Sequence, residues 1–237
     1  MDLRQLKGYL DHLAANLAGD DQRLLGTRLG GLSSVFPFNE YEYVLTFLVD
    51  RGVLAFDEYE KLRTNYVSAN RYLNLFGLSP RVFGQIWGEA HLRDLDPRFQ
   101  KPSCSVDPGY QGQCDLLLDS VRVEVKAARA IDTRKRGDIV SKALHRASSD
   151  AFWMNFQQLK PDACDVFVFI GVWVDHISYW VLSSAEAKGS RYLSHQHRGG
   201  IEFQIGITNK NLAEFTPFEC TAAELVATIL SKAHVSH

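Results

Sequence analysis

The feature that most constrains the fold of this chain is the alternating segment VRVEVKA at residues 121–127. Its apolar side chains occupy every second position, the period of a β-strand with one face in a core and one face turned away from it. Glu124 and Lys126 share the second face, about 7 Å apart at the backbone. The segment therefore predicts a strand that carries a carboxylate and an ammonium group side by side.

A hairpin adds a second carboxylate to this face. If residues 119–120 form a two-residue loop, Leu118 pairs with Val121. Counting back along both strands then sets Asp115 directly opposite Glu124. Opposed residues project to the same face with Cβ atoms about 5 Å apart, and like charges at that distance are destabilising. The pattern therefore predicts a cation between the two carboxylates.

Magnesium fits this requirement, because Mg²⁺ prefers one or two carboxylates together with waters and phosphate oxygens. The ion would stabilise charge on a phosphate under attack and lower the pKa of a bound water. Lys126 would orient or deprotonate that water, or offset phosphate charge. Glu89, on a helix that Ser79 and Pro80 begin, is predicted to complete the site or to hold a second ion. The alternative is an amphipathic hairpin with a solvated polar face, because motifs this short recur by chance.

Positive charge gathers beside these residues, although the whole chain is slightly acidic. The net charge is −2 and the pI is near 6.4, so no global field draws the protein to nucleic acid. Between residues 122 and 146, however, basic side chains outnumber acidic ones. Arg129, Arg134 and Lys135 are the predicted DNA contacts in this stretch, with an ordinary solvated face as the alternative.

A second candidate for DNA contact is the glycine-ended loop at residues 194–200, SHQHRGG. Arg198 can reach guanine O6 and N7, and Gln196 can reach adenine. His195 and His197 lie beside them, but two histidines without a third ligand are too few for a metal site. An ordinary exposed hairpin loop is the alternative.

The first third of the chain is predicted to be helical. Leucines in steps of three and four mark a helix up to Leu17, and residues 26–34 are predicted as loop. Asn39 and Asp57 then begin two further helices, of which the second stops at Gly77. These two helices could form a helix-turn-helix, but an ordinary packed pair fits better without a basic outward face.

The rest of the chain is predicted to combine strands with helices. Strands are expected at residues 116–118, 121–127, 166–174, 177–183 and 201–208, and a helix at residues 138–160. Asn155, Gln157 and Gln158, near the end of that helix, could contact phosphates or bases, but solvated or capping amides are the favoured interpretation. Trp153 is expected to be a core aromatic and not a base-stacking platform. On the helix that begins at Ser79, the apolar side chains are Val82, Phe83, Ile86, Trp87 and Ala90, with Glu89 at the edge of the inward stripe.

These elements predict an α/β fold with a mixed central sheet flanked by helices. A helical N-terminal region at residues 1–78, for DNA binding or dimerisation, precedes a catalytic domain at residues 79–237. The four cysteines have no metal-site spacing and are predicted to be reduced. No apolar run approaches the roughly 20 residues of a membrane helix, and the polar start lacks a signal-peptide centre, so a cytoplasmic protein without a membrane partner is expected.

Asp115, Glu124, Val125 and Lys126 resemble the PD-(D/E)xK signature of the restriction-endonuclease-like superfamily. The later segments DVFVFIGVWVD and ISYWVLSS resemble the strands of type II restriction endonucleases. The resemblance covers roughly residues 79–208, and Cys114 stands where the family often has proline. It implies Mg²⁺ bound by the Asp, the Glu and the carbonyl of Val125, a lysine that assists the attacking water, and a helix carboxylate at Glu89.

The resemblance implies a type II restriction endonuclease that hydrolyses double-stranded DNA at a short sequence, expected to act as a homodimer on a palindrome. A repair or recombination nuclease with the same site, selective for DNA structure, is the second hypothesis. The third is a DNA-binding module without catalytic activity.

Overall fold

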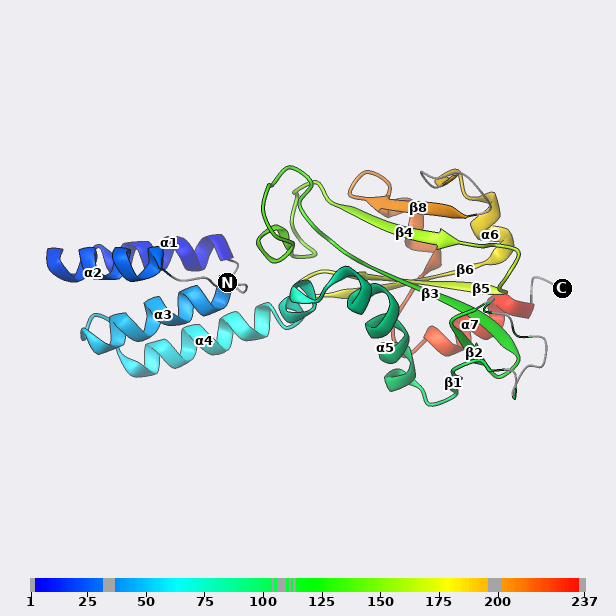
Figure 1. Ribbon diagram of the computed structural model, residues 1–237, viewed down its shortest axis with the longest axis horizontal. Coiled ribbons are helices and arrows are strands. Elements are labelled where there is room, and N and C mark those ends of the chain that lie inside the picture. The colour runs from blue at the N-terminus through cyan, green and yellow to red at the C-terminus, as the bar shows by residue number, and fades with distance from the viewer. Residues whose placement is uncertain are drawn as a thin grey trace.

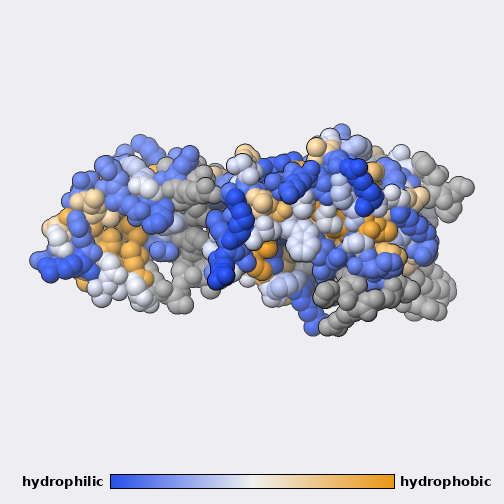
Figure 2. Space-filling view, turned by 90° about the horizontal axis from the view of Figure 1, so that it is seen from above, coloured by the Kyte–Doolittle hydropathy of each residue, from blue (hydrophilic) through white to orange (hydrophobic). Residues whose placement is uncertain are grey.

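The computed structural model describes residues 3–31, 37–103, 105, 110, 112, 114–195 and 202–234. Helices α1 to α4 form an elongated lobe at the N-terminal end, and two β-sheets with further helices form the rest (Figure 1). The chain therefore has the mixed α/β fold that the sequence predicts. Hydrophilic side chains cover most of the face shown in Figure 2. Within the described ranges, no helix has both the length and the apolar composition needed to cross a membrane.

The helical elements and strands have the following bounds. The helices are α1 (Leu3–Ala14), α2 (Gly19–Gly30), α3 (Pro37–Asp50), α4 (Phe56–Ala69), α5 (Gly88–Leu95), α6 (Ser184–Gly189) and α7 (Leu225–His234). Shorter turns are η1 (Leu73–Gly77), η2 (Val82–Trp87), η3 (Val140–Lys142) and η4 (Leu212–Phe218). The strands are β1 (Phe99–Gln100), β2 (Leu116–Leu118), β3 (Val121–Arg129), β4 (Trp153–Leu159), β5 (Val166–Val172), β6 (Ile177–Ser183), β7 (Leu193–His195), β8 (Phe203–Thr208) and β9 (Glu219–Cys220).

Buried leucines hold the N-terminal lobe together, as the predicted stripe requires. Leu10 of α1 and Leu48 of α3 lie in one core. The loop predicted at residues 26–34 is wrong where the structure describes it, because α2 continues to Gly30 and Leu25 anchors it in the core. A glycine inside a helix costs only about 1 kcal/mol relative to alanine, which the burial of one leucine can offset.

The other helices of this lobe begin and end differently from the prediction. α3 already includes Asn39, which was predicted as its cap, because the helix begins at Pro37. α4 begins at Phe56, with Ala55 and not Asp57 in the cap position. α4 also ends at Ala69 instead of continuing to Gly77. The amide of Asn70 turns back to donate to the carbonyl of Tyr66 at 2.8 Å, which competes with further helix. The chain then proceeds as the 3-10 turn η1.

The larger sheet of the described chain has the strand order β1-β2-β3-β5-β6-β9, and the smaller has the order β4-β8-β7. β3 and β5 are parallel, and β2 and β3 form an antiparallel hairpin. The predicted register is confirmed, because Leu118 pairs with Val121. β5 is buried on both faces: Val168 lies in the core that α5 and α7 cover, and Phe169 lies in the core between the sheets.

The five predicted strands are present with small changes at their ends, and β6 has both predicted bounds. β3 is two residues longer than predicted, whereas β5 ends two residues earlier. Cys114, Cys164 and Cys220 are free, as expected for reduced thiols, and Cys104 lies outside the described residues.

The helix predicted at residues 138–160 is wrong. Only the short turn η3 is helical there, and residues 153–159 form strand β4. Met154 and Phe156 alternate into the core between the sheets, so tertiary burial with period two decides the conformation. A β-bulge interrupts the strand between Phe156 and Leu159.

The helix predicted from Ser79 is present, but its inward stripe is displaced. A π-helical turn, η2, precedes α5 and shifts the faces of the helix relative to an ideal α-helix. Ile86, predicted to face inward, is 60% exposed, whereas Phe83 is buried as expected. Glu89 is 9% exposed, so it lies deeper than the edge position that the regular period predicts.

The domain boundary at residue 78 stays a prediction. Close to it, the backbone N–H of Tyr72 donates to the carbonyl of Val174 at 2.9 Å. The guanidinium of Arg71 bonds the neighbouring carbonyl of Asp175. The helical lobe is therefore tied to the end of β5 by hydrogen bonds.

Candidate active site

Two carboxylates and one ammonium group meet at the open end of the β2–β3 hairpin. Lys126 Nζ lies 3.6 Å from Asp115 Oδ2 and forms an ion pair with Glu124. Asp115 immediately precedes β2, and its backbone N–H donates to the carbonyl of Val123 at 3.1 Å. The predicted convergence of Asp115, Glu124 and Lys126 is thus observed.

Asp115 is fixed by the strand that it faces. Its Oδ2 accepts a hydrogen bond from the backbone N–H of Val125 at 2.9 Å. The paired part of β2 begins at Leu116, opposite Val123, so Val125 has no partner residue in β2. Because the N–H and C=O of one strand residue point to the same edge, the carbonyl of Val125 also faces the side on which Asp115 lies. This places a carbonyl oxygen beside the carboxylates, as the family resemblance implies.

Burial and charge act against each other in this cluster. Burial raises the pKa of Glu124, and the charge of Asp115 adds to this effect, against the opposing influence of Lys126. Burial alone would lower the pKa of Lys126, but Glu124 and Asp115 outweigh it and hold that pKa above its ordinary value. Lys126 is therefore protonated, and it supplies the positive charge that the paired carboxylates need.

Glu89 reaches the same place from the helix that covers the opposite face of β3. Gly88 allows this approach, because a Cβ at that position would lie only 3.3 Å from the Cβ of Ala127. The Glu89 carboxylate is paired with Lys101. Glu89, Asp115 and Glu124 line one cavity of about 280 Å³, so the structure brings the three predicted acidic residues to a common space.

The donor set suits a hard divalent cation only in part. In the described portion of the chain, no group of three or more His, Cys, Asp or Glu side chains is close enough to hold a metal ion. Asp115 and Glu124 nevertheless provide the one or two carboxylates that Mg²⁺ uses when waters and phosphate oxygens complete its shell. The Val125 carbonyl is an oxygen donor at the same edge. These oxygen donors are of the kind that a hard cation such as Mg²⁺ takes.

The predicted DNA contacts of the basic stretch have other partners. Arg129 lines a cleft beside the cavity, but its Nη1 donates to the carbonyls of Leu75, Phe76 and Leu78 at 2.8–3.2 Å. Burial also lowers the pKa of Arg129. Arg129 therefore caps η1 and joins the helical lobe to β3.

Arg134 pairs with Asp132 and Asp150 on an exposed turn. Lys135 is exposed next to it, and neither residue lines the cavity or the cleft. His195 ends β7, where its ring lies over that of Phe203. Gln196, His197 and Arg198 lie outside the described residues. Their proposed contacts with bases stay predictions.

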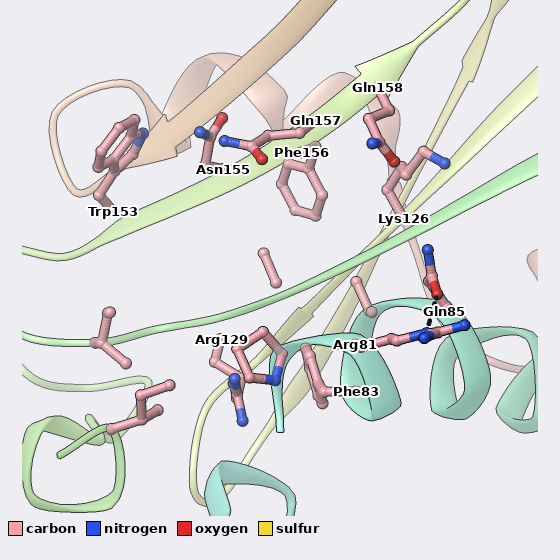
Figure 3. Close-up of a pocket in the computed structure, with 16 residues that line it drawn as sticks. Arg81, Phe83, Gln85, Lys126, Arg129, Trp153, Asn155, Phe156, Gln157 and Gln158 are labelled. Carbon is pink, nitrogen blue, oxygen red and sulfur yellow. Dashed lines mark hydrogen bonds between the residues drawn. The ribbon is translucent and has the colours of Figure 1, made fainter. Parts of the chain in front are cut away.

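A cleft beside the cavity is lined in part by residues for which the sequence predicts no place in the site. Its walls are β4 and η2, and its floor is the C-terminal half of β3, from Lys126 to Arg129 (Figure 3). Trp153, expected in the core, is 48% exposed and lines this cleft together with Gln157 and Gln158. The alternation of Met154 and Phe156 was the signal that could have placed these side chains on the outer face of a strand.

Comparison with known proteins found no match among family models, curated proteins or solved structures. The function must therefore be argued from the site itself.

Proposed function

We propose that this protein is a Mg²⁺-dependent endonuclease with a restriction-endonuclease-like core, which cuts double-stranded DNA at a short specific sequence. The observation that carries the proposal is the convergence of Asp115, Glu124 and Lys126 at the end of the β2–β3 hairpin. The element order supports it, since a helix bearing Glu89 precedes the hairpin and the buried strand β5 lies parallel to β3.

In this mechanism Asp115, Glu124 and the Val125 carbonyl would hold the metal ion. When bound, the ion supplies charge stabilisation for the phosphate and a more acidic water. Lys126, which lies against both carboxylates, would orient the attacking water and offset phosphate charge. Glu89 lines the same cavity and would be a further carboxylate for this chemistry, and its present partner is Lys101.

A symmetric homodimer would bring two such sites to the two strands of a palindrome. Two other functions remain to be separated from this one. A structure-specific nuclease would use the same side chains on branched or damaged DNA, and a catalytically inactive module would bind DNA without cutting it.

Digestion of methylation-free phage DNA with Mg²⁺ tests the proposal. Wild type should give discrete fragments, whereas Asp115→Ala and Lys126→Ala should give none. Asp162→Ala is the matched control, because Asp162 is an exposed acidic residue outside the cavity. Smears or cutting only at junctions would indicate the structure-specific nuclease. The absence of cutting with both Mg²⁺ and Mn²⁺, on duplex and branched DNA, would reject the nuclease function.

A further inference from the structure

The cleft between β4 and η2 adjoins the carboxylate cavity. Its volume is about 460 Å³, and it shares Gln85, Lys126 and Gln158 with that cavity. Figure 3 shows Gln158 on β4 above Lys126, with Arg81 and Gln85 on the facing helical turn. Arg81 Nε donates to Gln85 Oε1 at 3.2 Å, which joins these two side chains. The cleft and the carboxylate cavity are therefore neighbouring spaces with a common wall.

The bulge in β4 turns two consecutive amides outward. In a regular strand, neighbouring side chains point to opposite faces. Here both Gln157 and Gln158 are exposed, while Phe156 and Leu159 on either side of them are buried. Gln158 has φ +59°, an unusual conformation for a residue other than glycine. Such strained bulges are frequent beside functional sites, where they redirect a side chain.

Trp153 forms an apolar part of the same wall. A Cβ added at Gly206, on the neighbouring strand β8, would lie 2.7 Å from Trp153 Nε1. Only glycine at that position lets the indole lie across β8 in this way. The ring is half-exposed in spite of this support. Together with the two amides, it gives the cleft both hydrogen-bonding groups and an apolar contact surface.

We propose that this cleft reads an A·T base pair of duplex DNA, an inference that rests on the proposed function. A glutamine amide has one donor and one acceptor side and forms a paired contact with adenine N6 and N7. Gln157 has no hydrogen-bond partner among the described residues, so its amide is available for this contact. Trp153 offers the apolar contact that the thymine methyl takes in the major groove. Gln158 lines both the cleft and the carboxylate cavity, so it lies between this contact and the carboxylates.

Selection of cleaved sites from randomised duplexes tests this inference. The preferred site of wild type should contain an A·T pair at which Gln157→Ala loses discrimination by about tenfold or more. Gln100→Ala is the matched control, since Gln100 is an exposed strand glutamine outside both cavities, and it should keep the wild-type preference.

Modified bases at that pair make the test specific. Replacing adenine with 7-deazaadenine removes N7, which should weaken wild type but have little further effect on Gln157→Ala. Replacing thymine with uracil removes the methyl group, which should weaken wild type but not Trp153→Ala. A preferred site made only of G·C pairs would overturn the inference. Unchanged base preference in folded Gln157→Ala and Trp153→Ala proteins would overturn it as well.

A parallel selection of duplexes bound by Asp115→Ala separates this inference from the proposed function. A·T-selective binding that depends on Gln157 supports the inference even if wild type cuts no DNA. Conversely, sequence-specific cutting without any dependence on Gln157 or Trp153 overturns the inference and leaves the nuclease function standing.

Discussion

The two neighbouring spaces around Lys126 differ in how their polar groups are used. In the carboxylate cavity, the charges of Asp115, Glu124 and Lys126 are partly buried and satisfy one another. In the cleft, Gln157 and Gln158 are neutral and exposed. Buried charges held in place suit a reaction in which charge develops, because they need little reorganisation. The exposed amide of Gln157 suits recognition, because it can exchange water for a specific partner.

Replacing a carboxylate of the cavity should have the largest effect, and it should act on cleavage and not on binding. Asp115→Ala should lower the rate of DNA cleavage by at least about 100-fold, because it takes a metal ligand and the fixed charge from the reacting centre. Binding to the preferred duplex should persist, since the cleft is unchanged. Rates with saturating Mg²⁺, compared with those of Asp162→Ala, measure this effect. Loss of binding equal to the loss of cleavage would mean that the two spaces do not have separate functions.

Gly171 and Gly206 each lie against a tryptophan ring, one in the core and one at the cleft. A Cβ at Gly171 would lie 2.5 Å from Cζ3 of the buried Trp180. We expect Gly171→Ala to lower the free energy of unfolding by about 1–3 kcal/mol, because the core cannot yield without strain. Gly206→Ala should lower the free energy of unfolding by a smaller amount, because the exposed ring of Trp153 can move.

Denaturant unfolding of the two glycine variants measures the difference. Gly206→Ala should also change the base preference of cleavage when cleaved sites are selected from randomised duplexes. Equal destabilisation by both substitutions would indicate that Trp153 is held as rigidly as a core residue.

Mg²⁺ should stabilise the cavity without acting on the cleft. A cation bound only by the folded protein, at ten times its Kd, raises the free energy of unfolding by about 1.4 kcal/mol. Wild type and Gln157→Ala should both show this rise in thermal unfolding. Glu124→Gln should show a smaller one at the same concentration. If Mg²⁺ raises the stability of Glu124→Gln as much as that of wild type, the ion binds elsewhere.

The smallest expected effect is on the pH dependence of the metal-free protein. The pKa of Glu124 is raised in the folded state, chiefly by burial. Its contribution to stability is therefore fully present below the pKa of the unfolded state and is lost as pH rises through the folded pKa. Glu124→Gln should remove this acid-range loss. Melting temperatures measured in EDTA across the acid range, for both proteins, check the sign.

The sequence predicted the carboxylate site better than the cleft. The strict alternation of VRVEVKA and the two-residue loop determine which side chains of the hairpin share a face, so Asp115, Glu124 and Lys126 could be placed together. Trp153 and the glutamines of β4 could not, because their orientation depends on a bulge and on contact with β8. The π-helical turn η2 likewise changes the face of Ile86 without a clear sequence signal.

The most direct test of this account measures cleavage and sequence-selective binding for Asp115→Ala and Gln157→Ala side by side. Asp115→Ala should bind the preferred duplex and leave it intact in Mg²⁺. Gln157→Ala should still cut DNA, but with discrimination lost at one A·T pair. If Asp115→Ala cuts as well as wild type, the carboxylate cavity is not the catalytic site.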